Sequence, residues 1–127
     1  MLLAALVLAV TPSATDMNSG AFLYRSCTNL VRLWDGAKGF DLGRAADCKS
    51  YILGFLDGNG FAVAQDTAAG TGGSGHWLYC LDGAPSEKTA VRVYMNWMDK
   101  HPRAFPDPRS VGLVGALMDA YPCPVKK

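Results

Sequence analysis

The sequence contains little of what acid–base or metal chemistry requires. Its eleven acidic residues include a single glutamate, Glu87, and its only histidines are His76 and His101. Catalysis by a pair of glutamates is therefore excluded, and a His-rich metal site is disfavoured. No CxxC pair occurs, which argues against a zinc ribbon, a thioredoxin-like redox centre and covalently attached haem.

The chain also lacks an excess of charge of either sign. Twelve Lys and Arg residues balance eleven Asp and Glu residues, so that the formal net charge is +1. This balance excludes a globally basic nucleic-acid-binding protein and a globally acidic tail protein. The chain has 127 residues, half of them hydrophobic, which suffices for one domain with a real core.

A long apolar run occurs only at the N-terminus. Residues 1–10 are all apolar, and small polar residues follow them. Such a run is typical of a secretory signal peptide, although no Lys or Arg precedes it. It is shorter than the roughly 20 apolar residues that a membrane-spanning helix needs. We therefore expect a signal peptide over residues 1–14 and an exported, soluble domain over residues 15–127; a buried N-terminal helix is the alternative.

Four stretches carry apolar residues at the spacing of one helix face. The expected helices cover residues 17–35, residues 44–65, a third segment that starts after Ser86 and a fourth that starts at Pro108. The residues expected to face inward on them are Leu23, Cys27, Leu30 and Trp34, then Cys48, Ile52, Phe55 and Ala62, then Ala90, Val93, Tyr94, Trp97 and Met98, and finally Val111, Val114, Leu117, Met118 and Tyr121. Strand signals are nearly absent. The predicted fold class is all-α, a small four-helix bundle.

Capping residues support the boundaries of the last two helices. Ser86 is the expected N-cap of the third helix, which Pro102 stops. Asp107 is the expected N-cap of the fourth helix, with Pro108 at its first helical position, and Pro122 ends that helix.

Glycines mark two further features. Gly54 and Gly58 lie four residues apart in the second helix, so another helix is expected to approach closely there. A hairpin turn at residues 57–60 is the less favoured alternative, because the flanking residues show helical periodicity. Residues 67–76 are rich in glycine and lack apolar periodicity, which predicts a flexible surface loop.

The four cysteines, Cys27, Cys48, Cys80 and Cys123, allow three pairings into two disulfides, the default in an oxidising compartment. Cys27 and Cys48 lie at similar distances on either side of the 36–43 turn. Cys80 precedes the third helix and Cys123 follows the fourth, and consecutive helices with a short connection are antiparallel neighbours. The favoured pairs are therefore Cys27–Cys48 and Cys80–Cys123, which would staple the bundle.

No catalytic motif is complete. The glycine-rich stretch lacks the Gly-Lys-Ser/Thr of a phosphate-binding loop, and the Asp57-Gly58-Asn59 segment lacks the glycine and glutamate of a calcium-binding loop. A Cys–His nucleophilic pair would need a free thiol. We therefore expect no enzyme activity, no cofactor and no metal site.

Several short segments resemble one known family, the Rap/Tai proteins, which are resistance-associated and amidase-immunity proteins of type VI secretion systems. The resemblance covers roughly residues 18–124. It rests on Ser50-Tyr51-Ile52-Leu53-Gly54-Phe55, Trp77-Leu78-Tyr79-Cys80, Val91-Arg92-Val93-Tyr94 with Trp97, His101-Pro102, Ala116-Leu117 and Ala120-Tyr121-Pro122-Cys123-Pro124. The order and spacing of the cysteines among these segments is the more specific part of the resemblance.

The resemblance implies a periplasmic immunity protein that is all-helical, has two disulfides, often forms a homodimer and binds a toxic effector, such as a peptidoglycan amidase, by stoichiometric inhibition. The balanced charge described above argues against a nucleic-acid partner. A small periplasmic chaperone or stress protein is the alternative.

An inhibitor of a groove-shaped enzyme needs a rigid projecting element. The residues 101–109 are the favoured element, with Arg103, Phe105 and Arg109 as partner-binding residues; the 67–76 loop would lose more entropy on binding.

Overall fold

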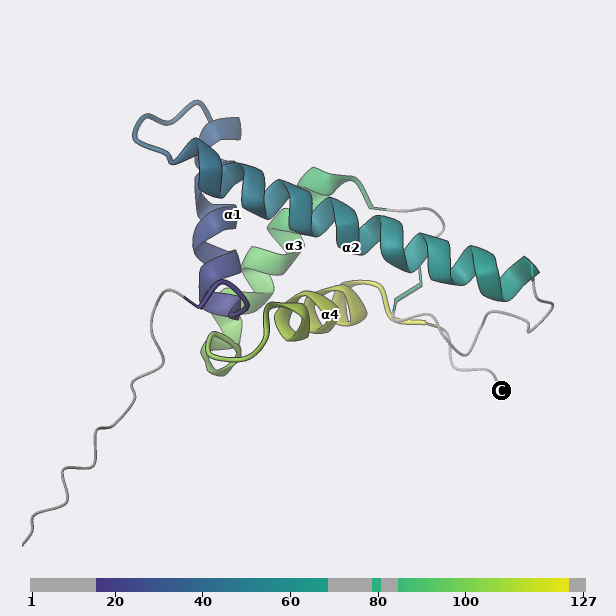
Figure 1. The fold of residues 1–127 in the computed structure, drawn as a ribbon. Helices are drawn as coiled ribbons and strands as arrows, with labels where there is room; N and C mark the ends of the chain where they lie inside the picture. Colours follow the sequence, from purple (N-terminus) through teal and green to yellow (C-terminus); the bar gives the residue numbers. More distant parts are fainter. Residues whose placement is uncertain (1–15, 69–78, 81–84, 124–127) are drawn as a thin grey trace, which may run out of the picture.

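A computed structural model describes residues 16–68, 79–80 and 85–123 of the chain. Within these residues the elements are the α-helices α1 (Gly20–Trp34), α2 (Leu42–Ala68), α3 (Glu87–Lys100) and α4 (Arg109–Ala120), and the 3-10 helix η1 (Pro102–Ala104). This part of the chain contains no named strand, so the predicted all-α fold of four helices is confirmed (Figure 1). The expected signal peptide, residues 1–14, lies outside the described residues, as does most of the glycine-rich segment.

The first helix follows its sequence signals closely. The Ser19 hydroxyl caps α1 by accepting a hydrogen bond from the Phe22 amide at 3.2 Å. Leu23, Cys27 and Leu30 are buried along one face, as their spacing predicts. Beyond the helix the chain turns through Gly36, whose φ of 69° is a left-handed conformation that glycine adopts without strain.

The second helix is longer than expected and differs from the prediction along its later half. Its first half buries Ala45, Cys48 and Ile52. Gly54 and Gly58 lie on the exposed side of α2, where a Cβ would meet nothing within 4 Å, so the expected close helix contact is wrong. Ala62, expected to face inward, is also exposed. The physical reasons differ: Gly54 lies on the side opposite the core, which Ile52 and Phe55 face, whereas Ala62 lies in the part of α2 that extends past the helices covering its beginning (Figure 1).

The third helix begins as predicted. The Ser86 hydroxyl accepts a hydrogen bond from the Thr89 amide at 3.2 Å, so Ser86 is the N-cap. The buried side of α3 carries Tyr94 and Met98, both fully buried.

In α2 the helix runs without a break through residues 57–60, which rules out the alternative of a hairpin turn there.

The fourth helix corrects two expectations. Asp107 is not its N-cap: the helix begins at Arg109, one residue later than predicted, so Pro108 takes the N-cap position, and proline has no side-chain acceptor. Val111 and Met118 are 45% and 48% exposed rather than buried. The face that α4 turns toward the core instead consists of Gly112, Leu113, Ala116 and Leu117. Its small residues let α4 approach α3 closely.

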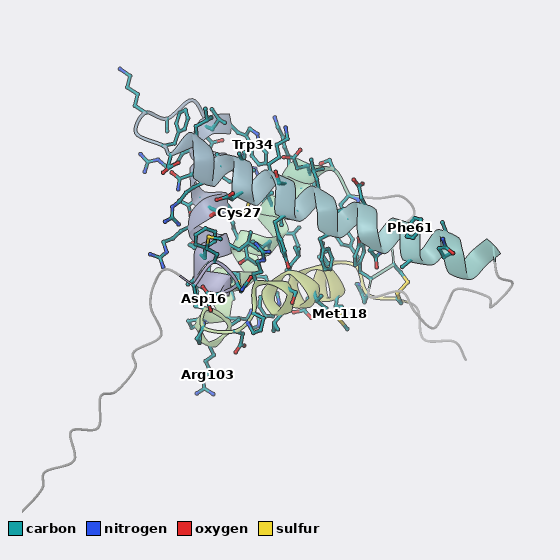
Figure 2. All side chains as sticks on the ribbon, in the orientation of Figure 1. Asp16, Cys27, Trp34, Phe61, Arg103 and Met118 are labelled. Carbon is teal, nitrogen blue, oxygen red and sulfur yellow. A yellow bond between two sulfur atoms is a disulfide. The ribbon has the colours of Figure 1, made fainter. Side chains whose placement is uncertain are left out.

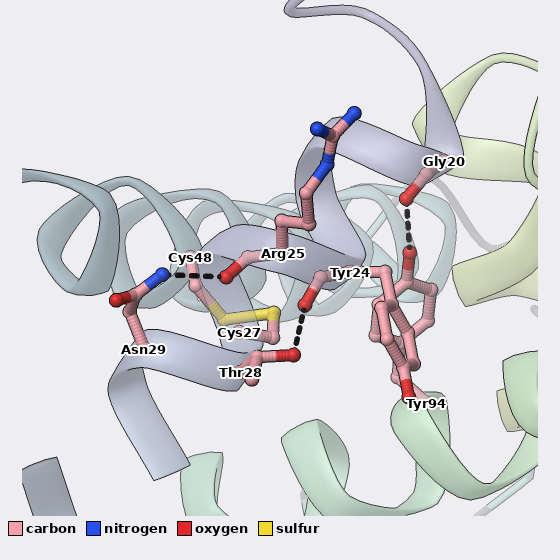
Figure 3. Close-up of a disulfide and its surroundings, with 8 residues drawn as sticks. All are labelled: Gly20, Tyr24, Arg25, Cys27, Thr28, Asn29, Cys48 and Tyr94. Carbon is pink, nitrogen blue, oxygen red and sulfur yellow. Dashed lines mark hydrogen bonds between the residues drawn. A yellow bond between two sulfur atoms is a disulfide. The ribbon is translucent and has the colours of Figure 1, made fainter. Parts of the chain in front are cut away.

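Both predicted disulfides are present. Cys27 and Cys48 join α1 to α2 with a Cα–Cα distance of 4.9 Å (Figure 3). Cys80 and Cys123 join the segment before α3 to the segment after α4 with a Cα–Cα distance of 4.6 Å. The loops they close imply stabilisation of about 3–4 kcal/mol each if unfolded-chain entropy dominates. The bundle is therefore braced at two separate places.

Candidate partner-binding surface

The connection between α3 and α4 is held firmly against the start of α1. Three main-chain hydrogen bonds join the two segments: Gly20 N to Asp107 O at 2.8 Å, Ala21 N to Phe105 O at 2.8 Å, and Arg109 N to Asn18 O at 2.6 Å. A bridge between Ser19 and Pro108 lies in the same region. Residues 101–109 thus form a supported ridge whose backbone is ordered before any partner binds.

Phe105 packs back toward the bundle. Its ring meets the Tyr24 ring edge-on, with centroids 5.1 Å apart and planes at 70°, and the side chain is half-buried. The Tyr24 hydroxyl donates a hydrogen bond to Asp99, and this bond, with partial burial, raises the pKa of Tyr24. Phe105 therefore helps to fix the ridge and presents only part of its ring to solvent.

The other two predicted residues lie on either side of Phe105. Arg103 in η1 is exposed and points away from the helices (Figure 2). The Arg109 guanidinium lies over the Tyr51 ring of α2, 4.0 Å from its centroid. Within the described part of the chain, no hydrogen bond, ion pair or ring contact links Arg103, Phe105 and Arg109 to one another. The ridge thus carries them at separate points.

A hollow of about 320 Å³ opens beside Arg109. It is lined by Met17, Phe22, Asp47, Ser50, Tyr51 and Arg109. These residues come from the segment before α1 and from α1, α2 and α4. A second guanidinium, that of Arg44, lies 4.8 Å from the centroid of the Phe22 ring. Arg44 is not among the lining residues, so the hollow itself combines two aromatic rings with one guanidinium, that of Arg109, and one carboxylate, that of Asp47.

A second hollow, of about 280 Å³, lies between α3 and α4. His101 stacks on Trp97 with centroids 3.8 Å apart, and its Nδ1 lies 2.7 Å from the Trp97 carbonyl. The indole N–H of Trp97 donates to Asp119 Oδ2 at 2.7 Å. Gly115 of α4 lies close to the same indole, where a Cβ would be 2.7 Å from a ring carbon. The protein's own residues thus hold Trp97 in position at the edge of this hollow.

The described residues contain no assembled catalytic or metal-binding group. All four cysteines are in disulfides, which removes the thiol that a Cys–His pair would need. In the described ranges, no cluster of three His, Cys, Asp or Glu residues is placed to hold a metal ion. His76 lies outside them. None of the described helices is long and apolar enough to cross a membrane.

Several contacts at this surface had no signal in the sequence. The Tyr24–Asp99 hydrogen bond joins residues 75 positions apart. The stacking of Arg44 on Phe22 and of Arg109 on Tyr51 likewise joins separate helices. Of these residues, the sequence singled out Arg109, which closes the 101–109 connection with its three prolines, and Tyr51, which belongs to a segment of the family resemblance.

Comparison with known proteins assigns the chain to a family. The family model described as Rap1a immunity proteins matches residues 19–123, which include all four described helices and both disulfides. Searches of curated proteins and of solved structures gave no significant match. Since the matched region covers most of the chain, the protein belongs to the family of Rap1a immunity proteins.

Proposed function

We propose that this protein is a periplasmic immunity protein that neutralises a type VI secretion effector by stoichiometric binding, with a peptidoglycan amidase as the expected effector. The observation that carries the proposal is the family match over residues 19–123. Two disulfides fit an oxidising compartment such as the periplasm, and the expected signal peptide over residues 1–14 would deliver the chain there.

The geometry favours the 101–109 ridge as the element that contacts the effector. Its backbone is already fixed by hydrogen bonds to residues 18–21, so little conformational entropy is lost on binding. Arg103 offers an exposed cation, Phe105 a partly exposed ring and Arg109 a guanidinium held over Tyr51. Arginine and aromatic side chains of this kind often dominate binding energy at interfaces. The ridge is therefore suited to enter or cover a groove.

A homodimer is part of the proposal. Phe61 of α2 is 66% exposed and lies on the part of that helix that extends past its neighbours. Sedimentation velocity at several concentrations tests it, and a single monomeric species up to high micromolar concentration removes the dimer from the proposal while leaving effector binding intact.

The test of function begins with the genes beside this protein's gene, and a secreted toxin encoded there is taken as the effector. The toxin is co-expressed in the periplasm with the wild type, with the double variant Arg103→Ala/Phe105→Ala, and with a control variant Lys38→Ala/Met118→Ala. The control removes an exposed cation and an exposed apolar side chain that both lie outside the 101–109 ridge. Affinity is measured on purified proteins by calorimetry, and folding by circular dichroism.

The wild type and the control should protect cells and bind at a 1:1 ratio of chains, whereas the ridge variant should bind at least tenfold more weakly, since hot-spot truncations cost about 2 kcal/mol or more. Equal binding by a folded ridge variant would contradict the ridge as the contact. If the wild type neither binds nor protects, the immunity function is wrong. The alternative, a chaperone, is then tested by suppression of client aggregation.

A further inference from the structure

We propose that Tyr24 of α1 is a positioning residue for the 101–109 ridge, holding the Phe105 ring in the orientation in which it meets the effector. The inference rests on the proposed function, because it takes the ridge as the contact surface. It adds Tyr24 and its hydrogen-bond partner Asp99 to the residues on which effector binding depends. Both lie outside the ridge and act through Phe105.

The main chain of the ridge is fixed at Phe105, but the side chain needs a further constraint. The Phe105 carbonyl accepts a hydrogen bond from the Ala21 amide at 2.8 Å, and the preceding residue, Ala104, is buried. These contacts place the backbone and leave the two side-chain torsions of Phe105 open to other rotamers. Since the side chain is only half-buried, the orientation of the ring depends on what the ring itself contacts.

Tyr24 supplies a contact of the required kind. Its ring meets the Phe105 ring edge-on, with centroids 5.1 Å apart and planes at 70°, an arrangement that aromatic pairs favour. Tyr24 follows Ala21 by three residues in α1, so the two side by side form one face of the helix. One stretch of α1 therefore holds both the main chain of Phe105, through the Ala21 amide, and its ring, through Tyr24.

Tyr24 is itself held at both ends. Its main chain belongs to α1, whereas its hydroxyl donates a hydrogen bond to Asp99 Oδ1 in the last turn of α3. This bond raises the pKa of Tyr24, as expected when a hydroxyl donates to a carboxylate. Cys27, three residues further along α1, is joined to Cys48 of α2, which ties this part of the helix to the core (Figure 3). A change of the Tyr24 rotamer would break the bond to Asp99.

The place of Asp99 explains why the bond matters to the ridge. Asp99 lies two residues before His101, at which the ridge leaves α3, and Phe105 rejoins α1 through the Ala21 amide. The hydrogen bond from Tyr24 to Asp99 thus connects the two helices between which the ridge is suspended. A partner that meets a ring already held in one orientation loses less side-chain entropy on binding. Affinity should therefore depend on Tyr24 through Phe105.

The first experiment needs no effector. The protein is labelled with ¹³C at its phenylalanine rings, and NMR compares the Phe105 ring signals of the wild type, Tyr24→Phe, Asp99→Ala and Asp99→Asn. Tyr24→Phe and Asp99→Ala both remove the hydrogen bond, so the Phe105 signals should move toward the positions of a free phenylalanine. Asp99→Asn keeps an oxygen that accepts from the Tyr24 hydroxyl and should leave them near the wild-type positions.

Hydrogen exchange gives a second readout on the same variants. The Ala21 amide, which donates to the Phe105 carbonyl, should exchange about threefold to tenfold faster in Tyr24→Phe and Asp99→Ala, because the ridge opens more often. The amide of Ile52, a fully buried residue of α2, serves as the reference for opening of the whole bundle and should be less affected. Unchanged Phe105 signals together with unchanged Ala21 exchange in Tyr24→Phe would overturn the inference.

Tyr79→Phe is the matched control. It also removes one tyrosine hydroxyl with a side-chain partner, Asn59 of α2, but leaves Tyr24 and Phe105 in place. It should alter neither the Phe105 signals nor the exchange of the Ala21 amide relative to the Ile52 amide. A control with the same effects as Tyr24→Phe would show that loss of any buried hydroxyl loosens the ridge, which contradicts a specific role for Tyr24.

Effector binding then tests the route through Phe105. Tyr24→Phe and Asp99→Ala should each weaken binding about threefold to tenfold, whereas Asp99→Asn and Tyr79→Phe should stay within about twofold of the wild type. In a Phe105→Ala background Tyr24→Phe should change affinity less than about twofold, because the ring that it positions is absent. An equal loss in both backgrounds would mean that Tyr24 acts without Phe105, and the inference would fail.

The two sets of measurements separate this inference from the proposed function. If the wild type binds the effector and Tyr24→Phe binds it equally tightly, the positioning role is wrong and the immunity function stands. If the wild type ignores the effector while Tyr24→Phe still moves the Phe105 signals and speeds Ala21 exchange, the immunity function is wrong and Tyr24 still orients the ridge. Weaker binding that depends on Phe105, together with both changes in the free protein, supports the two together.

Discussion

Gly112 of α4 lies directly against Met98 of α3. A Cβ built at Gly112 would be 2.5 Å from the Met98 sulfur and 3.2 Å from a ring carbon of Tyr94. Met98 and Tyr94 are both fully buried, so a shift of either ring or thioether presses on packed core neighbours. The absence of a side chain at position 112 therefore sets how closely α3 and α4 pack.

Gly112→Ala should destabilise the protein. Alanine has the better helix propensity by about 1 kcal/mol, but overpacking a dense core costs about 1–3 kcal/mol, and the contact at Met98 places this site at the upper end. We expect a net loss of about 1–2 kcal/mol in the free energy of unfolding, measured by urea denaturation with the disulfides intact. A variant as stable as the wild type would show that the Met98 side chain can move aside to accommodate the added methyl group.

Gly54→Ala is the matched substitution and should act in the opposite direction. Gly54 is exposed within α2, and a Cβ there meets nothing within 4 Å. The added methyl group thus brings only the gain in helix propensity, about 0.5–1 kcal/mol. The same urea titration should show a higher midpoint with an unchanged slope. A loss of stability would mean that the exposed side of α2 is covered, for example in a dimer.

These two glycines show how far the sequence predicts the fold. Helix existence, the Ser86 cap and the pairing of the cysteines depend on local spacing and chain order, and all three were predictable. Whether a helix face is covered depends on the neighbouring elements. The spacing of Gly54 and Gly58 suggests a close contact, but both glycines lie on the exposed side of α2. In α4 the register follows from the fit of Gly112 against Met98, which periodicity alone does not reveal.

The candidate site was less predictable for a related reason. Arg109 stood out because it follows a proline-rich connection. Its partner Tyr51 lies on another helix and has no local signal that pairs it with an arginine. Arg44 and Phe22 meet in the same way. Such contacts depend on the angle at which helices cross, which is fixed only when the whole core has packed.

The two disulfides should differ in their response to a reductant under native conditions. Cys27 and Cys48 are fully buried, whereas Cys80 and Cys123 are half-buried near chain segments outside the helices. Thiol–disulfide exchange requires access of the attacking thiolate to a sulfur atom. We expect Cys80–Cys123 to be reduced about tenfold or more faster, because Cys27–Cys48 becomes accessible only when the bundle opens.

Brief reduction at neutral pH, acid quenching, alkylation and peptide mass spectrometry would measure the order of reduction. A control in denaturant should remove the difference in rate, since burial is its cause. Faster labelling of Cys27 and Cys48 in native buffer would contradict the order and would indicate that α1 and α2 separate more readily than the ends of α3 and α4.

The buried Tyr94 predicts how stability responds to alkaline pH. Its hydroxyl donates a hydrogen bond to the Gly20 carbonyl at 3.1 Å in the core, and burial raises the pKa of Tyr94 well above the ordinary value (Figure 3). The unfolded chain ionises this tyrosine near pH 10 while the folded chain keeps it neutral. Its contribution to stability is therefore complete below about pH 10 and falls by roughly 1.4 kcal/mol per pH unit above it.

Tyr94→Phe isolates this contribution. At pH 7 the variant should be less stable by about 1 kcal/mol, because the hydrogen bond to the Gly20 carbonyl is lost. Above pH 10 only the wild type has a group at position 94 that ionises in the unfolded chain and stays neutral in the folded one, which stabilises its unfolded state. The difference in free energy of unfolding between the two proteins should therefore shrink and reach zero by about pH 11. Tyr24 and Tyr79 are present in both proteins and cancel in the comparison. Urea denaturation at intervals from pH 7 to 11 measures the difference, and a constant gap across that range would show that Tyr94 ionises as readily in the folded chain as in the unfolded one.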